Sequence, residues 1–318
     1  MISRFIRIEG FFIVLIILLV LASFSPILFG GQMFFNEEQI GFYYPHSYFF
    51  AKSLQDNTLL LWNNGYYAGV SVVFEQFVSA YFPLNRLLFS FLPYLFAHHL
   101  SIFLGTLFGC LAAYWFGRAS ALSQVSSFLL STSYLLATTF GWLSIGTLAA
   151  WSFFMIPALF LAILQRSQGK MPLLWTILGG VFIGVGFLAG FPQIAFYGYT
   201  IAGVFALYLF FTGEKEGGWR ARASILWAFG IMTIFGVLLS LPQTLPSSFL
   251  VGSTIRTSGF ALQPQNVNSP GVIQFIAFLF PEYVKTPLIG VGGTHGFYVG
   301  ALAFLTAFIG LLFTRTKV

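Results

Sequence analysis

A pair of adjacent carboxylates, Glu37 and Glu38, is the feature of this sequence best suited to chemistry. The pair follows the first apolar run and lies among aromatic residues, in a chain that has only 8 acidic residues in 318. Apolar surroundings raise the pKa of a carboxyl group, and a carboxylate tuned in this way can take a proton from an alcohol. The sequence therefore predicts a general base here. The alternative is that both residues are solvated loop charges.

Three basic residues are candidates for binding an anion. Arg256 lies in a stretch of small and hydroxyl residues, 252–259, and Arg86 lies beside apolar sequence. A guanidinium with neighbouring hydroxyl and backbone N–H groups suits a phosphate oxygen, because it can form paired hydrogen bonds. Lys285 is a weaker candidate of the same kind. The alternative for each is a cation that anchors the chain at a lipid surface while its stem packs on apolar groups.

The histidines and the cysteine limit the choice of metal site. His46 follows the carboxylates, His98 and His99 are adjacent, and His295 lies in a glycine-rich stretch. No two are four residues apart, so no zinc site of the His-x-x-x-His type is present. A hydrogen-bonded histidine is the favoured interpretation for each. The single Cys110 excludes a disulfide framework and a cysteine-based metal site. The sequence does not exclude a site for a divalent cation with oxygen ligands, and it assigns no cofactor.

Composition identifies the class of protein that must position these groups. Hydrophobic residues make up 58% of the chain, charged residues only 7%, and the mean hydropathy is +0.88. A soluble domain carries about a quarter charged residues, so we expect an all-α polytopic membrane protein. Glycine patterns such as Gly184-Val185-Gly186 lie inside apolar runs and indicate close helix packing. No nucleotide-binding or Ser-His-Asp motif is present in a credible context.

Apolar runs and basic residues together predict a topology. Windows of membrane-spanning length indicate eight crossings, near residues 11–29, 97–117, 121–141, 145–165, 172–191, 193–212, 224–242 and 296–314. Of the 14 basic residues, ten then fall on one side and four on the other, which places both termini in the cytoplasm. The first run is longer than a signal peptide requires and has no clear cleavage site, which favours a retained anchor over a cleaved signal.

We expect one transmembrane domain, 1–318, with two external regions. Residues 31–96 form a first external loop, and its aromatic-rich pieces 43–54 and 78–96 suit helices lying along the membrane interface. Residues 243–295 form a second external region, which begins after Pro242. Its one apolar run, 272–280, is too short to span and is typical of an interfacial or re-entrant segment.

Short motifs in a fixed order support a resemblance to a known family. They lie at residues 38–45, 61–63, 81–85, 99–100, 114, 118, 189–193, 242–246, 253–256 and 298–300. In this order they resemble the bacterial YfhO-type membrane proteins of the GT-C class, the polyprenyl-phosphate-dependent glycosyltransferases. The family's acidic residue, usually Asp, corresponds to Glu38, and Asn64 and Phe191 replace the family's usual Pro and His. Family members are commonly much longer than this chain.

The resemblance implies a GT-C-like helical bundle and a reaction at the outer face of the bacterial cytoplasmic membrane. A sugar would pass from a polyprenyl-phosphate donor to a cell-envelope glycan, lipid or protein, with no nucleic acid involved. Glu38 would be the base, with Glu37 beside it, and Arg256 would hold the donor phosphate, with Arg86 or Lys285. The other residues assigned to the substrate site are Trp62, Asn63, Gln193 and His295.

A transporter or a lipid-binding scaffold without chemistry is the main alternative. Such a protein would hold a lipid phosphate with the same arginine, and Glu38 would be an ordinary polar contact. Transporters often show halves related by an internal repeat, with broken helices near the middle of the membrane. No such halves are evident in this sequence, which favours the enzyme.

Overall fold

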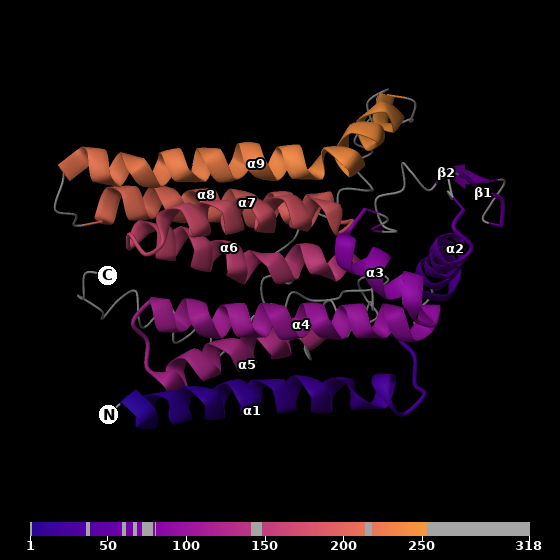
Figure 1. The fold of residues 1–318 in the computed structure, drawn as a ribbon, viewed down its shortest axis with the longest axis horizontal. Helices are drawn as coiled ribbons and strands as arrows, with labels where there is room; N and C mark the ends of the chain where they lie inside the picture. The colour runs from indigo at the N-terminus through magenta and orange to yellow at the C-terminus, as the bar shows by residue number, and fades with distance from the viewer. Residues whose placement is uncertain are drawn as a thin grey trace, which may run out of the picture.

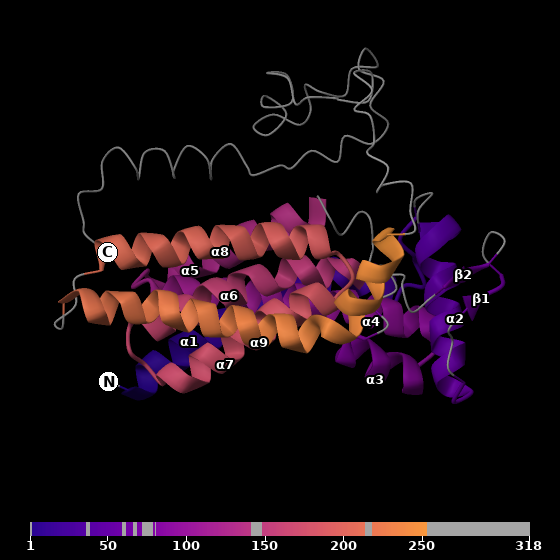
Figure 2. The same cartoon turned by 90° about the horizontal axis from the view of Figure 1, so that it is seen from above.

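The structure is a computed structural model, and it describes residues 2–35, 39–58, 62–65, 69–71, 79, 81–140, 148–213 and 218–252. Seven helices of this part run side by side, and each is antiparallel to the one before it (Figures 1 and 2). They are α1 (Ile2–Leu28), α4 (Tyr94–Ala119), α5 (Gln124–Phe140), α6 (Trp151–Ser167), α7 (Pro172–Leu188), α8 (Pro192–Thr212) and α9 (Gly218–Gly252).

These seven helices overlap the first seven predicted crossings, and the eighth, 296–314, lies outside the described residues. Four segments of the described part are long and apolar enough to cross a membrane: Ile8–Leu28, Tyr94–Ala119, Pro192–Thr212 and Gly218–Phe249. Two further apolar helices, α6 and α7, have 17 residues each. The expected all-α class is therefore confirmed for the described residues, and the long apolar helices fit the expected membrane protein.

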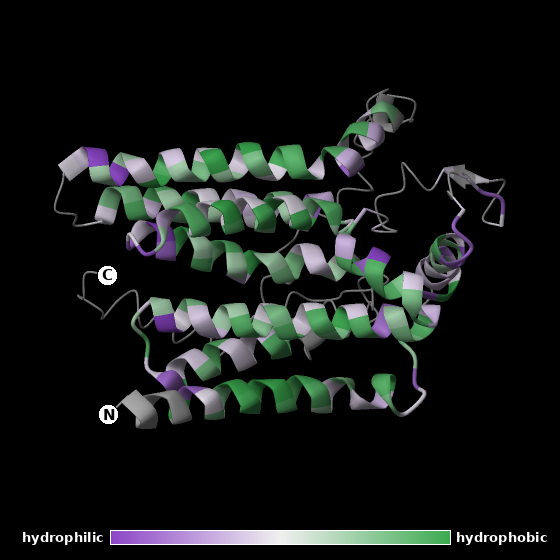
Figure 3. Cartoon of the chain, in the orientation of Figure 1, coloured by the Kyte–Doolittle hydropathy of each residue, from purple (hydrophilic) through white to green (hydrophobic). Residues whose placement is uncertain are grey.

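Polar residues concentrate at the two ends of the bundle, and apolar residues fill its length (Figure 3). We call one end the basic end. Helices α4 and α6 finish there with Arg118 and Arg166 in their last turns, and α9 begins there with Arg220 and Arg222. We call the other end the hairpin end, because α2, α3 and a β-hairpin lie there (Figure 1).

The hairpin end contains most of the predicted first external loop. A π-helical turn, η1 (Gln39–Tyr43), leads into α2 (Tyr44–Gln55), which lies across the end of the bundle (Figures 1 and 2). The helix predicted at 43–54 is therefore confirmed. The second predicted piece, 78–96, instead contains the short helix α3 (Pro83–Phe91) and the first residues of α4, which begins three residues earlier than predicted.

Short elements connect these helices. Strand β1 (Trp62–Asn63) pairs antiparallel with β2 (Val70–Ser71), and Trp62 lies opposite Ser71. A 3-10 turn, η3 (Leu148–Ala150), precedes α6. Proline occupies the first turn of α3, α7 and α8, where its missing N–H has no helical partner to lose.

The core has two parts. In one, α1 and α6 both pack against α4, and in the other α6 to α9 pack together. Glycines allow α7 and α9 to approach closely. A Cβ atom on Gly180 would lie 2.5 Å from Cδ1 of Phe235, and one on Gly184 would lie 2.8 Å from Cβ of Leu239. The close packing that the sequence indicated is confirmed for Gly184, whereas Gly186 has only ordinary contacts.

The last described helix, α9, extends beyond the crossing predicted at 224–242. Helix α9 continues through Pro242 and Pro246 to Gly252, ten residues further. An interior proline removes a backbone hydrogen bond and bends a helix, and α9 turns away from the bundle near its C-terminal end (Figures 1 and 2). The prolines therefore mark a bend in the helix and not its end.

Candidate functional site

A chain of hydrogen bonds centred on Tyr44 joins three segments at the hairpin end. The backbone N–H of Phe34 donates to the Tyr44 hydroxyl oxygen at 3.0 Å, and Tyr44 Oη lies 3.1 Å from Nε2 of His99. The His99 ring also bonds the backbone carbonyl of Ile27. Since the bond to the Ile27 carbonyl requires a ring N–H, Nε2 of the neutral ring accepts the Tyr44 proton. The end of α1, the start of α2 and the first turns of α4 are thereby held together.

A second contact reinforces the packing of α2 on α4. Ser47 Oγ lies 3.1 Å from Nδ1 of His98, and the rings of Tyr44 and His98 have centroids 5.0 Å apart. On α2 itself, Nδ1 of His46 donates to the carbonyl of Phe42 at 2.8 Å. The three described histidines are all buried and hydrogen-bonded, as the sequence indicated.

A third group of buried polar side chains links α3, α4 and α6. Ser101 Oγ donates to Oδ1 of Asn85 at 2.5 Å, and the indole N–H of Trp151 donates to the Ser101 hydroxyl and carbonyl oxygens, both at 3.0 Å. Asn85 is fully buried, and its Nδ2 has no hydrogen-bond partner within the described residues. Buried donors are normally satisfied, so this amide has capacity to bind a water or a polar group of a ligand.

The turn from α7 to α8 is fixed by two serines. Ser79 Oγ donates to the carbonyl of Ala189 at 2.5 Å, and Ser152 Oγ donates to the carbonyl of Gly186 at 2.7 Å. Gly190 has φ +102°, a conformation that a residue with a side chain rarely adopts. The turn therefore places the start of α8 at the hairpin end.

Four predicted site residues lie on described elements of this end. Asn63 is buried, and its Oδ1 accepts the backbone N–H of Gly65 at 2.9 Å, which closes a local turn. Trp62, its neighbour on β1, is 55% exposed. Arg86 is exposed on α3. Gln193 is exposed in the first turn of α8, and its Nε2 donates to the hydroxyl of Tyr197 at 2.7 Å.

The remaining predicted site residues, Glu37, Glu38, Arg256, Lys285 and His295, lie outside the described residues. The described part also offers no group of three His, Cys, Asp or Glu side chains that could hold a metal ion.

The described hydrogen-bonded network contains no Asp, Glu, Lys or Arg side chain. Burial raises the pKa of Tyr44 to about 12, although the Phe34 N–H opposes the shift, so the hydroxyl keeps its proton. Burial lowers the pKa of His46, and its bond to the Phe42 carbonyl opposes that shift. Neutral groups at fixed positions can orient a backbone or a ligand, whereas proton abstraction needs a base of the kind predicted at Glu38.

Sequence reasoning missed most of this network. Tyr44, Ser47 and Trp151 have partners 50 to 55 residues away, so no local spacing indicates the pairs. It also missed an ion pair at the basic end, where Nη2 of Arg118 lies 2.8 Å from Oε1 of Glu9 and the Tyr114 hydroxyl donates to the same carboxylate. A carboxylate within the first apolar helix was a usable signal, because such a group needs a partner.

No family model, curated protein or solved structure matches this chain.

Proposed function

We propose that this protein is a GT-C-type membrane glycosyltransferase of the YfhO kind. It moves a sugar from a polyprenyl-phosphate donor to a cell-envelope acceptor on the outer face of the bacterial cytoplasmic membrane. The observation that carries the proposal is the location of two chain segments. η1, which begins directly after Glu38, and the end of α9, which precedes Arg256 by four residues, both lie at the hairpin end (Figure 1).

The surroundings of the residues on either side of the carboxylate pair support a catalytic role for it. On one side, the Phe34 N–H is held by the Tyr44 hydroxyl, which is in turn held by His99. On the other side, Gln39 is fully buried. A general base works only when it is held within hydrogen-bond reach of the proton that it removes, so rigid flanks are what such a residue requires.

In the proposed reaction, Glu38 accepts the proton of an acceptor hydroxyl as that oxygen bonds to the anomeric carbon of the sugar. The bond between the anomeric carbon and the donor phosphate breaks, and polyprenyl phosphate leaves with the bonding electrons. Arg256, together with Arg86 or Lys285, stabilises the charge on the leaving phosphate. Trp62, Asn63, Gln193 and His295 contact the substrates in this proposal.

The proposed topology has eight crossings, both termini in the cytoplasm and the hairpin end outside. It is supported by the basic residues at the opposite end of the bundle, because short cytoplasmic loops carry an excess of lysine and arginine. It is also supported by α2, which lies across the bundle as an interfacial helix would (Figure 1). Residues 1–318 form a single domain in this proposal.

The test is sugar transfer by the purified protein in liposomes, with a polyprenyl-phosphate sugar as donor. Glu38→Gln keeps the size of the side chain but removes the proton acceptor, so the rate is expected to fall by about a hundredfold or more. Glu37→Gln is the matched control and is expected to do less. Arg256→Ala is expected to weaken donor binding, because the phosphate loses its paired hydrogen bonds.

Two results would contradict the proposal. Equal transfer rates for Glu38→Gln and the unaltered protein would exclude Glu38 as the base. Binding of polyprenyl phosphate without transfer from any donor would favour the lipid-binding or transporter alternative.

A further inference from the structure

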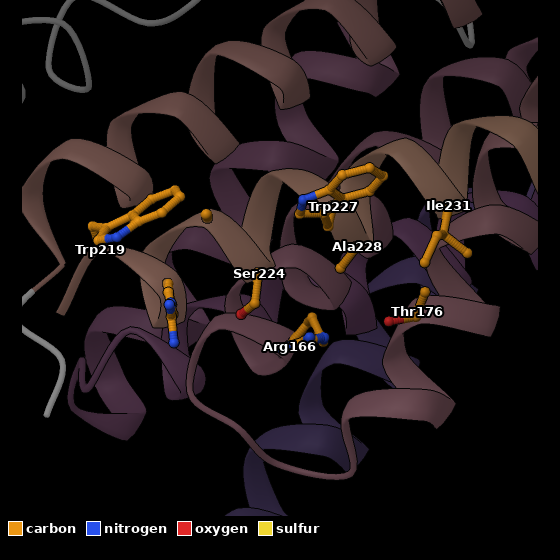
Figure 4. A pocket seen from close by; sticks show the side chains of 9 residues that line it. Arg166, Thr176, Trp219, Ser224, Trp227, Ala228 and Ile231 are labelled. Atoms are coloured by element: carbon orange, nitrogen blue, oxygen red, sulfur yellow. The ribbon is translucent and has the colours of Figure 1, made fainter. Parts of the chain in front are cut away.

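A cavity of about 310 Å³ lies at the basic end, between α6, α7 and α9. Arg166, from the last turn of α6, and Arg220, from the first turn of α9, both line it. Thr176 of α7 and Ser224 of α9 add hydroxyl groups, and Trp219 and Trp227 add indole rings (Figure 4). The cavity lies at the opposite end of the bundle from the proposed catalytic site.

The described charges around this cavity favour an anion; Glu214 and Glu216, which precede α9 in the sequence, lie outside the described residues. The described residues include two carboxylates with described side chains, Glu9 and Asp56. Glu9 is paired with Arg118, and Asp56 follows α2 at the hairpin end. Neither Arg166 nor Arg220 forms an ion pair with a residue of the described part. Two like charges on one small cavity repel each other, and an anion bound between them removes that cost.

Helix geometry adds to the positive potential. Arg220 is the third residue of α9, a helix of 35 residues that begins at Gly218. The first N–H groups of a helix lack partners within it and carry the positive end of its dipole. A phosphate bound beside Arg220 therefore lies near both a guanidinium and a helix N-terminus.

The two hydroxyl groups can accept hydrogen bonds from the same ligand. Thr176 Oγ1 donates to the carbonyl of Pro172 at 2.7 Å, and Ser224 Oγ donates to the carbonyl of Ala221 at 2.7 Å. Each hydroxyl proton is thus used within its own helix, and each oxygen keeps acceptor capacity. A ligand that combines a phosphate with hydroxyl groups, such as a glycerol headgroup, matches this set of partners.

The apolar surroundings indicate that the ligand is a lipid. Trp219 and Trp227 are 67% and 75% exposed, and Ile231, one turn further along α9, is also exposed. In the view of Figure 4 the two indoles lie above Arg166 and Thr176. Indole rings favour the headgroup level of a bilayer, and the apolar face beyond them suits acyl chains. A soluble phosphate would leave these contacts unused.

We propose that this cavity binds the headgroup of an anionic glycerophospholipid, with its phosphate between Arg166 and Arg220. Basic pockets between membrane helices on the cytoplasmic side are suited to such headgroups. The bound lipid connects the end of α6 to the start of α9.

The experiment measures binding of phosphatidylglycerol to the delipidated protein in detergent by native mass spectrometry. Each arginine is expected to contribute about fivefold in affinity, so Arg166→Gln with Arg220→Gln should lose about 25-fold. Arg222→Gln is the matched control, because Arg222 lies on the same helix but does not line the cavity. Phosphatidylcholine, which has no net charge, should bind more weakly than phosphatidylglycerol to the unaltered protein.

Unchanged phosphatidylglycerol affinity in the double variant would overturn the proposal. A loss of affinity in Arg222→Gln equal to that of one cavity arginine would also overturn it, because binding would then depend only on general surface charge. Displacement of the lipid by millimolar inorganic phosphate would identify a site for soluble anions instead. If the double variant fails to fold, Arg220→Gln alone gives the test, because Arg220 is exposed. The binding measurement does not depend on sugar transfer, so its result tests this proposal independently of the proposed catalytic function.

Discussion

Replacing Tyr44 by phenylalanine should loosen the hairpin end, because the hydroxyl group serves two partners. In Tyr44→Phe, Nε2 of His99 loses its donor and the N–H of Phe34 loses its acceptor. His99 is buried, so its unsatisfied nitrogen costs about 1 to 3 kcal/mol, and the partly buried amide of Phe34 adds about 1 kcal/mol. The expected loss in the free energy of unfolding is therefore about 2 to 4 kcal/mol.

The chain provides its own probe for this measurement. Cys110 is its single cysteine and is fully buried in α4, so a fluorogenic maleimide reacts with it only when the protein opens. At about 2 °C per kcal/mol, the apparent unfolding temperature of Tyr44→Phe should fall by about 4 to 8 °C. Hydrogen exchange at the Phe34 amide should become faster in the same variant, because the bond that protects it is gone.

Tyr48→Phe is the matched control for this prediction. Tyr48 lies one turn further along α2, is exposed, and makes only ring contacts with described residues, to Phe49 and Tyr94. The same loss of a hydroxyl group there should change the unfolding temperature by less than about 1 °C. The reasoning is refuted if the two variants unfold at the same temperature, or if exchange at Phe34 is unchanged in Tyr44→Phe.

Two further predictions use the same thiol assay. Gly236→Ala should destabilise the protein by about 1 to 3 kcal/mol, because the new Cβ would lie 2.5 Å from Cγ2 of Ile183. Gly230→Ala on the same helix should instead stabilise the protein by up to about 1 kcal/mol, because the new Cβ would have no neighbouring atom within 4 Å among the described residues. Effects of the same sign would contradict this account of the α7–α9 contact. Burial lowers the pKa of His46, so below about pH 6.5 the unfolded chain binds a proton at this residue and the folded protein does not. The contribution of His46 to the free energy of unfolding is therefore complete above that pH and decreases as the pH falls toward the pKa of the folded state. His46→Asn should make the unfolding temperature less dependent on pH between about 6.5 and 5.5, and an unchanged slope would show that His46 does not titrate in this way.

The helices were predictable from the sequence because a long apolar run has few other stable structures in a membrane. Proline gave good N-terminal boundaries, as at Pro172 and Pro192, where the residue lies in the first turn. At Pro242 the same residue does not mark the end of the helix, since a proline inside a long helix bends it without ending it.

The described site was less predictable, because its contacts join residues that are far apart in the chain. The adjacent histidines drew attention to the start of α4, but nothing local indicates that His99 bonds Tyr44 or that His98 bonds Ser47. Asn85 lies in one of the recognised motifs, yet its buried amide becomes notable only when Ser101 is found to bond its oxygen atom.

The glycine-lined contact between α7 and α9 has a consequence for the synthesis of the protein. Four glycines weaken α7 as an isolated helix, at about 1 kcal/mol each relative to alanine, and the residues that pack on three of them belong to α9. At about 5 to 20 residues per second, a ribosome needs roughly 3 to 13 s to proceed from the end of α7 to the end of α9. For an interval of that length, α7 has left the ribosome and α9 has not. The insertion machinery, or α6 alone, must protect its exposed glycine face until α9 arrives.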